Sequence, residues 1–260
     1  MATFDDIYAR KLDLGRVAER TLWVLGRQPL IIFGVALVLY GLPTAGSLEL
    51  ANRWFSDSLD LGQFFHSPVV GGSMLAGMLI AALLEGCLMS TALGELGGRS
   101  ATLPEVLTTG LKFLLPLFAV NLFFVLAFVG GLVLLVVPGV ILALAWCVAG
   151  PALMVERSGI TAVFGRSAEL TRDNRWRLFA LALIFAIASS ILQGSAGHYH
   201  DVGSPFWLDD MVFSPVNILI RSVLSSLFHA VAIVALAVVY VELRTLKEGS
   251  PPADLDQVFS

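Results

Sequence analysis

Long apolar runs are the feature that most constrains how this chain can fold. Six of them approach the ~20 residues that cross the ~30 Å hydrocarbon core of a bilayer. The 260-residue sequence is 57% hydrophobic and only 14% charged, whereas soluble chains carry roughly a quarter charged residues. The sequence therefore predicts an all-α membrane protein with six transmembrane helices. The predicted spans are 30–42 (extended by residues from 22 onward), 69–93, a third that continues to 137 from the helix beginning at 103, then 139–156, 176–191 and 216–241.

An amphipathic helix precedes each pair of predicted spans. Apolar residues recur at the offsets 0, 3, 4, 8 and 11 from Leu14 and Leu103, and at the first four of these offsets from Ile160, where Thr171 stands at the last one. These offsets form one face of a helix. Thr102 and Glu105 have the spacing of a capping box at the start of the second helix. The pattern predicts three pseudo-repeats of a cytoplasmic amphipathic helix plus a transmembrane hairpin, although any interfacial helix can show this periodicity. The predicted units are 14–95, 103–156 and 160–242, within a single membrane domain 1–246 that precedes a flexible cytoplasmic tail 247–260.

Each predicted unit ends at a glutamate that has an arginine close by in the sequence. These neighbours are Glu95 and Arg99, Glu156 and Arg157, and Glu242 and Arg244. A fourth helix, short and interfacial, is expected over residues 1–13, and we expect the first span to be a retained anchor.

Basic residues predict the orientation of the chain. Six spans place both termini on one side, and that side holds fourteen of the sixteen lysines and arginines; only Arg53 and Arg221 lie on the other. Because cytoplasmic loops are enriched in Lys and Arg, we expect both termini and the amphipathic helices in the cytoplasm. The aromatic loops 44–67 and 193–215 are then external.

Four motifs carry a resemblance to a known family. They are VPGVILALAW from Val137, PALMVERSGI from Pro151, GRSAELTRDNRWRL from Gly165, and YVELRTLKEG from Tyr240, followed by ADLDQVF. Together they resemble the membrane domain of some glycerophosphoryl diester phosphodiesterases and the related YciC-type bacterial inner-membrane proteins. The resemblance implies a six-helix domain in the bacterial inner (cytoplasmic) membrane. It implies no catalysis, because hydrolysis in those phosphodiesterases belongs to a separate soluble barrel for which these 260 residues have no room.

Three polar residues fall inside predicted spans and are candidate ligand-binding residues. Glu85, Asn121 and His229 each lie roughly 12–20 Å from the cytoplasmic end of their span, from a rise of ~1.5 Å per residue, and could share one layer. Polar groups within spans usually face the bundle interior. A buried polar layer could bind a polar group or relay a proton. It could equally be a hydrogen-bonded staple between helices.

Basic residues also gather where the third amphipathic helix meets span five. Arg166, Arg172, Arg175 and Arg177 form this cluster, and such clusters attract anionic lipid headgroups at a membrane surface. The alternative is that they only mark topology. Membrane lipids with anionic headgroups on the cytoplasmic side are therefore expected partners, with a membrane protein partner or a second copy of the chain also possible.

Other motifs give weaker signals. His198 and His200 stand near acidic residues, but a single His-x-His pair in a loop more often reflects a solvated loop than a zinc site. We expect no metal and no cofactor. The glycines at 71, 72, 77, 86, 130 and 131 are expected to permit close helix packing. No nucleotide-binding or hydrolase motif is present in the sequence, and the basic residues are not arranged for nucleic acid.

Two function classes follow from these observations. The first is a non-catalytic inner-membrane protein that binds or translocates a lipid or another amphiphilic small molecule through its helix bundle. The second is a membrane scaffold or regulatory subunit of another membrane complex, with residues 253–259 of the tail as a docking helix. An enzyme is not expected.

Overall fold

The computed structural model describes residues 11–55, 68–134, 136–195 and 215–249, and this part of the chain is helical without strands. The expected all-α class is confirmed. The predicted interfacial helix over residues 1–13, the loop residues His198 and His200, and the tail lie wholly or mostly outside the described residues. The helices are α2 (Leu14–Arg27), α3 (Pro29–Ala36), the π-helical turn η1 (Leu37–Gly41), α4 (Leu42–Phe55), α6 (Pro68–Leu96), α7 (Leu103–Leu134), α8 (Val136–Trp146), α9 (Ala149–Glu156), α10 (Ile160–Thr171), α11 (Arg175–Ser195) and α13 (Pro215–Glu248).

Five helical segments within these residues are long and apolar enough to cross a membrane. A sixth is obtained if α10 and α11, which meet at a bend of 99°, are counted as one broken span. This agrees with a multi-pass membrane protein. The five segments are Pro29–Ser47, Gly71–Leu96, Leu103–Val133, Val136–Glu156 and Pro215–Glu248.

The three amphipathic segments do not end in the same way. Asp13 caps α2, since its carboxylate accepts from the backbone N–H groups of Gly15 and Arg16. α2 and α10 are both separated from the helix that follows. The middle segment instead continues through Pro116 into its span as one helix, α7. Its start matches the expectation, because Glu105 accepts a 2.9 Å hydrogen bond from the backbone N–H of Thr102.

Two glycine pairs bring helices into close contact. A Cβ on Gly86 of α6 would lie 3.0 Å from the Cα of Gly110 in α7, and a Cβ on Gly131 of α7 would lie 2.8 Å from the Cα of Gly139 in α8. Small residues allow such backbone approaches in membrane helices. The expectation of close packing is therefore confirmed for Gly86 and Gly131. It is wrong for Gly71, Gly72, Gly77 and Gly130, where a Cβ would meet nothing within 4 Å.

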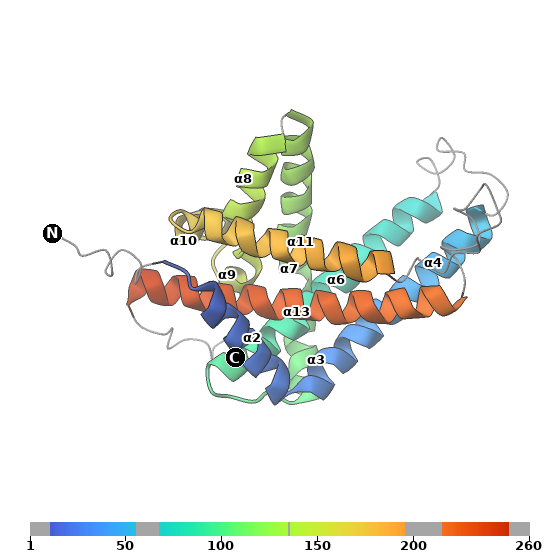
Figure 1. Cartoon of the computed structure of the whole chain (residues 1–260), viewed down its shortest axis with the longest axis horizontal. Coiled ribbons are helices and arrows are strands. Elements are labelled where there is room, and N and C mark those ends of the chain that lie inside the picture. The colour runs from blue at the N-terminus through green and yellow to red at the C-terminus, as the bar shows by residue number, and fades with distance from the viewer. Residues whose placement is uncertain (1–10, 56–67, 135, 196–214, 250–260) are drawn as a thin grey trace.

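These contacts produce two arms that diverge from a common base (Figure 1). α6 and α7 pack together near the Gly86–Gly110 contact and separate towards their other ends. The α7–α8 hairpin forms one arm. The other contains α4, the N-terminal half of α6, α11 and α13, and α13 contacts all three of these helices. The C-terminal half of α13 supplies much of the core, including the fully buried Tyr240.

Candidate functional site

Span four is interrupted at residues 147 and 148, between α8 and α9. The break removes the helical donor of the Ala145 carbonyl, and an unpaired carbonyl is costly in a membrane. A hydroxyl of α10 replaces that donor, since Ser167 Oγ donates to Ala145 O at 2.8 Å. Thr171 Oγ1 lies 3.3 Å from the same oxygen, but its shorter hydrogen bond, at 2.9 Å, is to the Ser167 carbonyl within α10. Both residues are fully buried. α10 is therefore fixed to the break by hydrogen bonds as well as by apolar packing.

Glu85 lies on the opposite side of this break. Its carboxylate accepts a 2.6 Å hydrogen bond from the side-chain amide of Asn121 in α7. Its other oxygen is close to Gly150 in the first turn of α9, where a Cβ would collide with it. Three helices thus meet at one carboxylate. The sequence pointed to Glu85 and Asn121, and the structure brings them into contact.

His229 has a different environment from these two residues. Its ring stacks on Tyr40, with centroids 4.5 Å apart and an angle of 10° between the rings. Tyr40 belongs to η1, and a π-helical turn of this kind is often found at functional sites. Beside it, a cavity of about 420 Å³ lies between η1–α4 and α6 and includes Thr44 and Ser73 in its lining.

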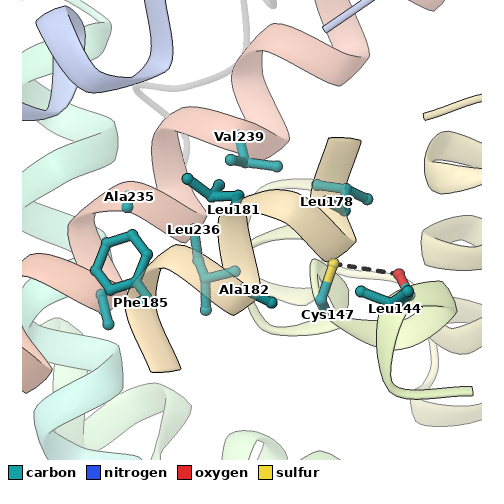
Figure 2. A pocket seen from close by; sticks show the side chains of 10 residues that line it. Leu144, Cys147, Leu178, Leu181, Ala182, Phe185, Ala235, Leu236 and Val239 are labelled. Atoms are coloured by element: carbon teal, nitrogen blue, oxygen red, sulfur yellow. Dashed lines mark hydrogen bonds between the residues drawn. The ribbon is translucent and has the colours of Figure 1, made fainter. Parts of the chain in front are cut away.

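A second cavity, which we call the lateral cavity, lies where α8, α11 and α13 meet. It has a volume of about 260 Å³ and an almost entirely apolar lining, and it is partly open. Figure 2 shows the α13 side chains together with Leu181 and Phe185 of α11 on one side, and Leu144 and Cys147, with Leu178 of α11 beside them, on the other. Cys147 Sγ donates to the Leu144 carbonyl, so the break in span four forms part of the wall. The lining residues are Leu144, Cys147, Leu178, Leu181, Ala182, Phe185, Ala232, Ala235, Leu236 and Val239.

The four arginines of the predicted basic cluster do not form a uniform surface. Arg166 pairs with three carboxylates: its Nε donates to Glu156 at 2.9 Å, its Nη1 lies 3.4 Å from Glu169, and its Nη2 donates to Glu248. Glu156 also accepts from the hydroxyl of Tyr240 at 3.1 Å. Arg166 therefore links α9, α10 and α13.

Arg177 is also used within the protein. It donates to the backbone carbonyl of Leu12, and the backbone N–H of Leu12 donates to Asn174 at 2.8 Å. Leu12 is fully buried, so this pair of bonds fixes the N-terminal segment against the start of α11. Arg172 is exposed and Arg175 half-buried, and no ion pair involves either residue within the described part of the chain.

The glutamates that end the predicted units pair with arginines on other helices. Glu95 lies 3.4 Å from Arg27 of α2, and Glu242 lies 2.6 Å from Arg20 of α2. Arg99, the sequence neighbour of Glu95, pairs with Glu105 instead. The glutamates thus join separate helices, which their spacing along the chain did not reveal.

Among the residues that the structure describes, no group of three or more His, Cys, Asp or Glu side chains could hold a metal ion. Sequence reasoning missed Gly150, Ser167 and Thr171, which define the break in span four. The Gly150–Pro151 pair was the available signal, since proline has no N–H to donate to the carbonyl four residues earlier.

No family model, curated protein or solved structure matches this chain. The family resemblance therefore rests on its four motifs alone, and the geometry described above carries the functional argument.

Proposed function

We propose that this protein is a non-catalytic integral membrane protein that binds the apolar part of a lipid or similar amphiphile in the lateral cavity. The observation that carries the proposal is the cavity itself: its lining is almost wholly apolar, and it is a partly open space between α8, α11 and α13. Small-molecule sites are concave and mostly apolar, and they form between helices of bundles. The hydrocarbon tail of an amphiphile fits this chemistry.

The finer topology belongs to the same proposal. Six spans, with α11 as the fifth and α10 as the interfacial helix before it, place both termini in the cytoplasm of a bacterium. The chain then lies in the inner membrane, with three helix-plus-hairpin units along its length. Fourteen of sixteen basic residues on one side support this orientation. The ion pairs of Glu95, Glu156 and Glu242 lie at the span ends that this orientation places in the cytoplasm.

The test uses native mass spectrometry of the protein released from gentle detergent, with identification of any bound lipid. Ala182 lines the cavity from α11, and its side chain is exposed there, so Ala182→Phe fills space without displacing the core. Ala186→Phe is the matched control, because it makes the same substitution one turn later, outside the lining. We expect a retained amphiphile with the wild type and Ala186→Phe, and its loss with Ala182→Phe.

Equal retention by Ala182→Phe would reject the lateral cavity as the site. A chain that carries no lipid but a co-purified membrane protein would favour the scaffold alternative. Deleting residues 251–260 then separates the two functions, since a scaffold that docks through its tail should lose its partner, whereas a ligand in the lateral cavity should stay bound.

A further inference from the structure

We propose that the ligand of the lateral cavity is an anionic phospholipid whose phosphate is held by Arg172 and Arg175. One acyl chain then occupies the cavity along α11. This inference rests on the proposed function and adds the headgroup class and the orientation of the lipid.

The helix face of α11 supports this orientation. Leu178, Ala182 and Phe185 line the cavity, and Arg175 precedes Leu178 by three residues, so it lies on the same face one turn earlier. From Leu178 to Phe185 the lining extends about 10 Å, at ~1.5 Å per residue. An apolar slot with a cationic residue at one end has the charge distribution that an anionic amphiphile requires.

The available hydrogen-bond donors also point to this end of the cavity. Arg166 and Arg177 are engaged by carboxylates and by the Leu12 carbonyl. Arg175 Nε is shielded from solvent and has no hydrogen-bond partner within the described residues. A shielded donor without an acceptor is unfavourable, and a phosphate oxygen would supply that acceptor in the planar geometry that arginine favours.

The nearby acidic groups pair chiefly with other cations, although Asp173 also interacts electrostatically with Arg172. Asp173 lies next to Arg172, but its carboxylate accepts a 2.9 Å hydrogen bond from Lys247, and this bond lowers the pKa of Asp173. Glu169 is paired with Arg166. The N-terminal end of α11 adds a favourable dipole for an anion.

Trp176 places this region at the level of lipid headgroups. It directly follows Arg175 and is 84% exposed. Tryptophan side chains are enriched at membrane–water interfaces. A phosphate bound by Arg172 and Arg175 would therefore lie at the depth where phospholipid phosphates lie in the bilayer, with its acyl chain directed into the hydrocarbon core.

The experiment is a competition in nanodiscs that contain equal amounts of phosphatidylglycerol and phosphatidylcholine with identical acyl chains. Bound lipid is counted by native mass spectrometry. We expect the wild type to prefer phosphatidylglycerol and the double variant Arg172→Gln/Arg175→Gln to lose roughly thirtyfold of that preference, from ~1 kcal/mol per basic residue near the surface. Arg99→Gln/Arg157→Gln removes the same charge elsewhere on that side and should keep the preference.

The outcomes separate the headgroup assignment from the proposed function. Unchanged preference in Arg172→Gln/Arg175→Gln, together with loss of all lipid in Ala182→Phe, would overturn the headgroup assignment and leave the cavity as a binding site. Unchanged lipid binding in both variants would overturn both. A third outcome concerns free phosphate. If inorganic phosphate alone protected the wild type against thermal unfolding, at concentrations that displace phosphatidylglycerol, the site would bind free phosphate and the lipid assignment would be overturned.

A measurement on the unaltered protein covers the case in which the arginine variant does not fold. Diacylglycerol with the same acyl chains lacks the phosphate, so the wild type should retain phosphatidylglycerol and lose diacylglycerol in a direct competition. Equal retention of the two would overturn the headgroup assignment without any substitution.

Discussion

The contact between Glu85 and Gly150 shows how much a single residue can constrain the interior of this protein. A carboxylate inside a membrane span is costly unless it has polar partners. Asn121 supplies one hydrogen bond, and the absence of a side chain at Gly150 allows α9 to approach the other carboxylate oxygen. The backbone of Gly150 is helical, so any preference for glycine here comes from space: a side chain at this position would have to move the ends of the Glu85 and Met89 side chains.

The first prediction concerns this contact. Gly150→Ala should lower stability by about 1–3 kcal/mol, the usual cost of overpacking, because the new methyl group would collide with the Glu85 carboxylate. Thermal unfolding in detergent, followed by circular dichroism, measures the effect.

Gly77→Ala is the control, because it also lies in a membrane span and a Cβ there would meet nothing within 4 Å. In the double variant Gly150→Ala/Glu85→Ala the collision is absent. Its loss of stability should therefore be smaller than the sum of the losses in the two single variants. Strict additivity would contradict the assigned contact.

At the scale of whole elements, α10 is positioned by the interruption of another helix. Ser167 and Thr171 are four residues apart and thus on one face of α10. Ser167 donates to the Ala145 carbonyl at the end of α8, and the Thr171 hydroxyl lies within reach of the same oxygen. The same helix carries Arg166, whose guanidinium pairs with carboxylates of α9 and α13. α10 is therefore held by polar contacts along two of its sides.

The second prediction tests the hydroxyl contacts. Ser167→Ala/Thr171→Val should cost about 1–3 kcal/mol, because the Ala145 carbonyl is then buried without a donor. Each single variant should cost less, since the other hydroxyl remains within reach of that carbonyl. Unfolding in detergent again reports the change.

Thr161→Val provides the comparison for this pair, because Thr161 lies on the exposed face of α10. Its stability should match that of the wild type. If the double variant also unfolded at the wild-type temperature, the hydroxyls would not be what satisfies the break in span four.

At the scale of the whole molecule, the two ends of the described chain are joined. α2 pairs with the end of α13 through Arg20 and Glu242, which lie 2.6 Å apart, and Arg16 lies 3.7 Å from the same carboxylate. The Glu242 side chain is only 4% exposed. A nearly buried carboxylate depends on its cationic partners, so these arginines are more than surface charges.

The third prediction concerns this closure. Arg16→Gln/Arg20→Gln should destabilise the protein by about 1–3 kcal/mol, less than the loss for a fully buried pair because both arginines are partly solvated. Restoring neutrality in the triple variant with Glu242→Gln should recover part of the loss.

Glu19→Gln changes one charge on an exposed position of the same helix and should leave the unfolding temperature unchanged. A triple variant less stable than the double variant would show that Glu242 is stabilised by something other than these arginines.

The sequence by itself determined the all-α class of this protein and most of its long apolar helices. It did not predict that helix α4 extends to Phe55, within the expected loop 44–67, or that span four is interrupted at residues 147 and 148. Apolar runs of span length, the helical periodicity from Leu14 and Ile160, and the Thr102–Glu105 cap are local features, so they can be interpreted without a partner. The polar residues Glu85 and Asn121 were also identifiable, because a polar side chain within an apolar run needs another polar group.

Only the tertiary structure decided which residues meet. It paired Glu95 with Arg27 and Glu242 with Arg20, and it used Arg166 and Arg177 within the protein. Hydropathy and residue spacing indicate which face of each helix is apolar and which is polar. These sequence patterns do not indicate which helices are neighbours, because neighbours are determined by packing between residues far apart in the chain.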